Sequence, residues 1–192
     1  MRLANLIENI IGKHRYATTD DVRDTFGDYH NALNWLATFL VGDEKGSDIY
    51  VVDAGMLAES QTPDFHDWLV HWAARATLRR ALQSEQNQIA ELAAEYENKE
   101  ANCTERDPLS PKEFQCLVRN SEEIRDRLDV LCRFVLVIRG IAKESIEEVA
   151  AQLGISRNAV QCAYCVALDT LFPSDKRSSC SAPALKALGA ES

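Results

Sequence analysis

The stretch that decides the fold is Ser145-Ile-Glu-Glu-Val-Ala-Ala-Gln-Leu-Gly154-Ile-Ser156-Arg-Asn-Ala-Val160. Ser145, followed three positions later by a glutamate, forms a capping box that begins a helix. Gly154 ends that helix, because glycine accepts the left-handed backbone of a helix C-terminus, and Ser156 can cap a second helix. Ala150, four positions before the glycine, lets the two helices cross closely. The pattern predicts a helix-turn-helix, whose second helix can enter a DNA major groove. Two packed helices of an ordinary bundle remain the alternative.

The residues around this stretch keep the helical period. A preceding helix has one apolar face, made of Leu131, Phe134, Val135, Ile138 and Ile141. Further helices are predicted near the N-terminus and over residues 28–41, 47–59, 65–82 and 86–97. Because no segment offers a partner strand, the predicted fold class is all-α.

Composition divides the chain into two small helical domains, over residues 28–82 and 119–173. Residues 83–118 are polar and predict a linker with a short helix, loosest between residues 102 and 111. An N-terminal helical extension over residues 1–27 and a flexible tail over residues 174–192 complete the predicted organisation.

The overall composition excludes several functional classes. The chain has 192 residues, a net charge of −9 and 46% hydrophobic residues, which is ordinary globular composition. No apolar run reaches the roughly 20 residues that span a membrane, and the N-terminus lacks the pattern of a signal peptide. The six cysteines are irregularly spaced, so we expect a cytoplasmic protein with reduced thiols.

Motifs of catalysis are also missing from the sequence. It has no glycine-rich phosphate loop, nucleophile elbow or paired-carboxylate motif, so we expect no enzyme, catalytic residue, cofactor or small-molecule substrate. Cys162 and Cys165 lie three positions apart, and we place them near the exposed side of the second helix. No second cysteine pair or nearby histidine completes a metal site, so no metal is expected.

Three segments together resemble a known family. Residues 128–160, from Leu128-Asp-Val-Leu to Val160, resemble region four of bacterial sigma-70 family RNA polymerase sigma factors. The segment Phe65-His-Asp-Trp68-Leu-Val-His-Trp72-Ala-Ala-Arg75-Ala-Thr-Leu-Arg79-Arg80 resembles their region-two helix, which reads the minus-ten element. Ser47-Asp48-Ile-Tyr-Val-Val-Asp53-Ala-Gly-Met-Leu57 lies where the family has an acidic helix for the polymerase clamp. Length and order resemble the extracytoplasmic-function (ECF) type.

The resemblance implies a transcription initiation factor that binds core RNA polymerase and promoter DNA, with an anti-sigma factor as a possible further partner. It implies polymerase contacts from Asp48 and Asp53. The implied DNA contacts are Ser156, Arg157, Asn158, Gln161, Trp68, Trp72, Arg75, Arg79 and Arg80.

The predicted recognition helix departs from the family in its charge. Gln161, Ala163 and Val166 stand where the family carries one lysine and two arginines. Residues 144–172 contain one cation, Arg157, against four carboxylates, although cations supply most non-specific affinity for DNA. Two alternatives therefore stay open. One is a sigma fold that has lost DNA reading and acts as a protein-interaction or regulatory module, and the other is an unrelated dimeric helix-turn-helix regulator.

Overall fold

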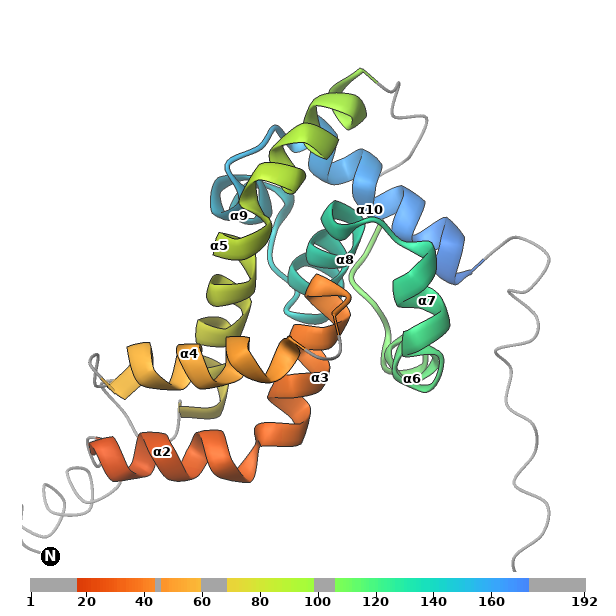
Figure 1. Ribbon diagram of the computed structural model, residues 1–192. Helices are drawn as coiled ribbons and strands as arrows, with labels where there is room; N and C mark the ends of the chain where they lie inside the picture. Colours follow the sequence, from red (N-terminus) through yellow and green to blue (C-terminus); the bar gives the residue numbers. More distant parts are fainter. Residues whose placement is uncertain (1–16, 44–45, 60–68, 99–105, 173–192) are drawn as a thin grey trace, which may run out of the picture. The chain divides into compact units, whose positions relative to one another are not determined.

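The computed structural model describes residues 17–43, 46–59, 69–98 and 106–172. Within these ranges the regular structure is helical and no strand occurs (Figure 1). This confirms the predicted all-α class. The predicted N-terminal helix before residue 17, Trp68, and the predicted tail after residue 173 lie outside the described residues. The chain divides into two compact units, Met1–Asn87 and Gln88–Ser192.

The first unit contains α2 (Thr19–Asp28), α3 (His30–Val41), α4 (Ser47–Glu59) and the first part of α5 (Leu69–Glu97). The helices predicted over residues 28–41 and 47–59 are present. Apolar side chains of all four helices form one core, which includes Val22, Phe26, Leu33, Ala37, Val51, Ala54, Leu69 and Ala73. Because α2 contributes to this core, residues 19–27 belong to the first unit rather than to a separate N-terminal extension.

One continuous helix, α5, replaces the two helices predicted over residues 65–82 and 86–97. No glycine or proline interrupts residues 69–97, and the polar stretch after Leu82 is rich in glutamine, glutamate and alanine, which favour helix. The division between the units falls inside this helix, between Asn87 and Gln88. The polar composition that suggested a linker at residue 83 is therefore the solvent-facing side of a long helix.

In the described residues, the second unit contains the rest of α5 and six further elements. These are α6 (Pro111–Arg119), α7 (Ser121–Arg127), α8 (Val130–Val135), the π-helix η2 (Leu136–Ile141), α9 (Ile146–Leu153) and α10 (Arg157–Leu171). The core is fully apolar at its centre, where Leu117, Leu131, Phe134, Leu136 and Val160 are all completely buried. Residues 111–119, assigned to the linker by composition, form a helix with its own capping box between Ser110 and Glu113.

The predicted capping box, left-handed turn and second helix cap are confirmed at α9 and α10. The Ser145 hydroxyl accepts a hydrogen bond from the Glu148 amide, and the Glu148 carboxylate accepts one from the Ser145 amide at 2.7 Å. The Ser145 hydroxyl also donates to the Glu148 carboxylate at 2.8 Å, and the bonds from the Ser145 amide and hydroxyl lower the pKa of Glu148. Gly154 has the left-handed φ of 67° expected at the turn, and the Ser156 hydroxyl accepts from the Ala159 amide at the start of α10.

Residues 106–109, in the stretch predicted to be loosest, are anchored to the second unit. The Leu109 amide donates to the Gly140 carbonyl at 3.0 Å, and the Tyr164 hydroxyl donates to the Asp107 carbonyl at 2.9 Å. A Cβ atom at Gly140 would lie only 3.2 Å from Leu109 Cγ. The glycine in the π-helix therefore permits the close approach of this segment.

Candidate functional site

The predicted DNA-reading residues at the start of α10 already contact other parts of the second unit. The Ser156 hydroxyl donates to the Glu97 carboxylate, and the Asn158 side-chain amide donates to the Glu97 carbonyl at 3.2 Å. Arg157 forms an ion pair with Glu147, and Gln161 is half-buried. Ser156 and Asn158 thus contact the last turn of α5, whereas Arg157 contacts α9.

The middle of α10 is more buried than the sequence suggested. Cys162 and Cys165 are each only 5% exposed, so their predicted position near the exposed side is wrong. Ala163 is fully buried and Val166 is 40% exposed, so only part of the surface that carries cations in the family is open here. The stretch of α10 from Cys162 to Cys165 is therefore buried within the second unit.

The oxidation state of the cysteines also differs from the prediction. Cys165 is disulfide-bonded, whereas Cys116, Cys132 and Cys162 are thiols. The expectation of reduced thiols throughout is therefore wrong at Cys165. Among the described residues no group of three or more metal-ligating side chains occurs.

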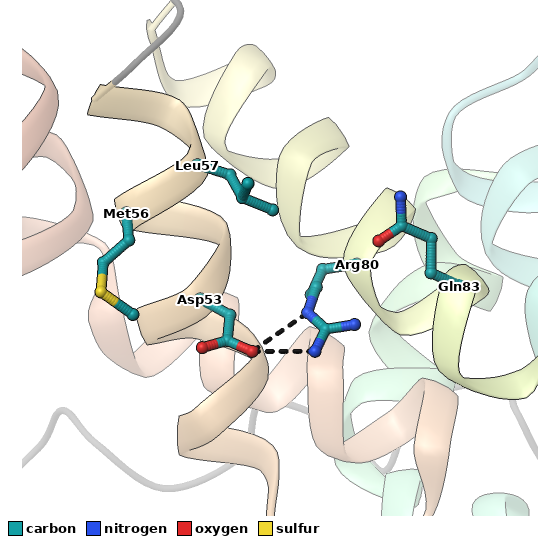
Figure 2. Close-up of a pocket in the computed structure, with 5 residues that line it drawn as sticks. All are labelled: Asp53, Met56, Leu57, Arg80 and Gln83. Carbon is teal, nitrogen blue, oxygen red and sulfur yellow. Dashed lines mark hydrogen bonds and ion pairs between the residues drawn. The ribbon is translucent and has the colours of Figure 1, made fainter.

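In the first unit, a residue predicted to contact polymerase binds a residue predicted to contact DNA. Asp53 of α4 and Arg80 of α5 form an ion pair, in which Arg80 Nε and Nη2 lie 3.1 and 2.9 Å from the same carboxylate oxygen (Figure 2). The Arg80 guanidinium also lies 6.0 Å from the centre of the Tyr50 ring. The pair lines an open pocket of about 360 Å³ together with Met56, Leu57 and Gln83. Arg80 therefore joins α4 to α5.

The other predicted residues of α5 differ in their exposure. Arg75 and Arg79 are exposed on the helix surface. Trp72 is half-buried against the first core, and its ring meets the Phe26 ring edge-on at a centroid distance of 6.5 Å. This packing gives Trp72 a structural role whatever its exposed edge contacts.

The outer face of α4 is a feature that the sequence reasoning missed. Ile49, Val52 and Met56 follow one another at helical spacing and are 61%, 53% and 60% exposed. We call these three residues the α4 stripe. Asp48 lies beside it, exposed, with its carboxylate 3.7 Å from the His30 ring nitrogen. A signal for the stripe was present in the sequence, because residues 47–59 are apolar on both faces. Among those whose burial is described, Val51 and Ala54 are the buried apolar residues of the core.

Comparison of the chain with known proteins identifies no relative. The chain matches no family model, no curated protein and no solved structure. No helix in the described parts of the chain is both long and apolar enough to cross a membrane. The assignment of Asp48 and Asp53 to polymerase, and of the α5 and α10 residues to DNA, stays a prediction.

Proposed function

We propose that this protein is a sigma-like transcription initiation factor that binds core RNA polymerase and directs it to promoter DNA. The observation that carries the proposal is the helix-turn-helix, with Gly154 in the left-handed turn and Ser156 capping α10. This geometry presents the first turn of the second helix to a major groove.

The α4 stripe supports the polymerase contact. Three neighbouring exposed apolar side chains are unusual on a helix that borders a core, and such patches mark protein interfaces. Asp48 lies at the edge of the stripe and suits a partner that carries cations around an apolar centre. Asp53 takes part indirectly, since its ion pair with Arg80 fixes α4 against α5.

The negative charge of the chain explains why promoter binding would require polymerase. The net charge of −9 repels duplex DNA, and the one cation of the α9–α10 motif, Arg157, is paired with Glu147. Arg75 and Arg79 are the exposed predicted DNA contacts on α5. Polymerase would hold both units on one promoter, so that two weak contacts act as one site.

A protein-interaction module is the second candidate function. The burial of Ala163, Cys162 and Cys165 favours it, because these residues cannot reach DNA bases from their positions in the structure. Such a module would retain polymerase binding through α4 but would not select promoters.

One experiment separates these functions. Core polymerase from the same organism is tested for retention of the chain, and the complex is then tested for open-complex formation on genomic promoter fragments. Val52→Asp in the α4 stripe should weaken retention at least tenfold, because a charge in an interface core costs several kcal/mol. Val118→Asp on α6, at a similarly exposed valine, serves as the control.

The paired variant Arg75→Ala/Arg79→Ala should be retained by polymerase but should form no open complex. Retention with no promoter selection by the unmodified chain would support the interaction module instead. Tight, sequence-specific binding of duplex DNA by the isolated chain as a dimer would refute the sigma-like proposal and support an ordinary regulator.

A further inference from the structure

The last turn of α5 is fixed within the second unit. Ile89, Ala93 and Tyr96 recur at helical spacing and are 1%, 8% and 3% exposed. The Tyr96 hydroxyl donates to Asp129 at the start of α8, with an oxygen–oxygen distance of 2.7 Å. Because these three side chains hold the helix end in the core, Glu97 occupies a defined position.

That position is the N-terminus of α10. The Glu97 carboxylate accepts from the Ser156 hydroxyl, and its carbonyl accepts from Asn158. A helix N-terminus attracts anions through its exposed amides and its dipole. In a helix-turn-helix bound to DNA, this is also the end that meets bases and phosphates. A carboxylate of the protein itself therefore lies where DNA would bring negative charge.

The face of α10 that carries Asn158 is also covered toward the C-terminal end of the helix. Asn158, Cys162, Cys165 and Asp169 are spaced by four, three and four positions, so they share one face. Cys162 and Cys165 are buried. At the far end of the face, Asp169 forms an ion pair with Arg106 at 3.1 Å. Segments that precede and follow residues 99–105 thus contact α10 at both ends of this face.

We propose that the contacts of Glu97 with Ser156 and Asn158 are an autoinhibitory latch, which closes the DNA-reading end of α10 in the isolated chain. This inference rests on the proposed function, since it assumes that α10 reads DNA. Opening requires Glu97 to leave the start of α10. The latch adds a specific block to the general repulsion between an acidic protein and DNA.

The test compares Glu97→Ala with Glu95→Ala in the full chain. Glu95 is an exposed carboxylate in the same helical turn, so both variants lose one negative charge. Only Glu97→Ala loses the carboxylate contact with Ser156, and the bond from Asn158 to the main-chain carbonyl of residue 97 remains in both variants. Binding to a fluorescent duplex carrying a promoter selected by the polymerase complex is measured by anisotropy. Both variants and the unmodified chain are assayed with excess dithiol, so that the Cys165 disulfide does not hold α10 independently.

Glu97→Ala should raise the affinity of the isolated chain for duplex at least fivefold, and Glu95→Ala should raise it less than twofold, the effect of one remote charge. Amide exchange at Ala159 and Val160, in the first turn of α10, should accelerate in Glu97→Ala alone, because the Ser156 cap loses its support. Equal affinities of the two variants, with normal promoter complexes on polymerase, would overturn the latch and leave the proposed function intact. Failure of every variant to form a promoter complex with polymerase would overturn both.

Discussion

Replacing Tyr96 with phenylalanine should destabilise the second unit, because it removes a buried hydrogen-bond donor and keeps the ring. Tyr96 is 3% exposed, and its hydroxyl lies 2.7 Å from Asp129 Oδ2 and 3.2 Å from Cys132 Sγ. Burial is the largest cause that raises the pKa of Tyr96, followed by its bonds to Cys132 and Asp129. The hydroxyl is therefore neutral and donates throughout the usual pH range.

The magnitude follows from the charge and exposure of the acceptor. A hydrogen bond to a charged group contributes about 1.5–3 kcal/mol. Asp129 is half-buried, so water replaces part of the lost bond, and we expect Tyr96→Phe to cost about 1–2 kcal/mol. Asp129 also caps α8 by accepting from the Cys132 amide at 2.7 Å. This second bond stays intact in the variant.

Tyr164→Phe is the matched control. Tyr164 is equally buried, and burial raises its pKa to about 12, but its hydroxyl donates to an uncharged carbonyl, that of Asp107. It should cost only about 0.5–1.5 kcal/mol. Urea unfolding followed by circular dichroism gives both values. A double-mutant cycle of Tyr96→Phe with Asp129→Asn, which keeps a capping side chain, should give a coupling near 1 kcal/mol. A coupling indistinguishable from zero would show that the Tyr96–Asp129 bond does not stabilise the unit.

Two further predictions concern the helix-turn-helix. Gly154→Ala should cost about 1–2 kcal/mol in thermal unfolding, because φ is 67° and no atom lies within 4 Å of the added Cβ, so the loss comes from the backbone alone; an unchanged midpoint would contradict this. The lowered pKa of Glu148 means that its capping bond stabilises α9 above the ordinary glutamate pKa, and that this stability is lost as the pH falls through the folded value. Amide protection factors in the first turn of α9 should therefore fall in acid, and Glu148→Gln, which removes the titrating carboxylate, should abolish this pH dependence.

The features that the sequence predicted correctly depend on neighbours within four residues. The capping box joins Ser145 to Glu148, the left-handed turn needs only Gly154, and the Ser156 cap bonds the Ala159 amide. Each is an interaction within one helical turn, so residue type and spacing determine it. The all-α class follows from the same local periodicity.

The continuity of α5 was missed for a different reason. Composition divided the chain where polar residues begin, yet polar residues with high helix propensity continue a helix when one stripe stays apolar. Ile89, Ala93 and Tyr96 supply that stripe. Three apolar positions among many polar ones are a weak signal in the sequence. In the structure, however, these three side chains are what pack the end of α5 into the core.

The candidate site was predicted least well because its chemistry comes from pairs that are distant in sequence. Asp53 and Arg80 are 27 positions apart, and Glu97 and Ser156 are 59 apart. Asp53, Arg80 and Ser156 alone each have the residue type expected for binding polymerase or DNA, whereas nothing in the sequence singled out Glu97. Once paired, Arg80 is held by α4, and the first turn of α10 is held by α5. Residue type therefore indicated which surfaces carry charge, whereas the tertiary contacts determine which of those charges a partner must first displace.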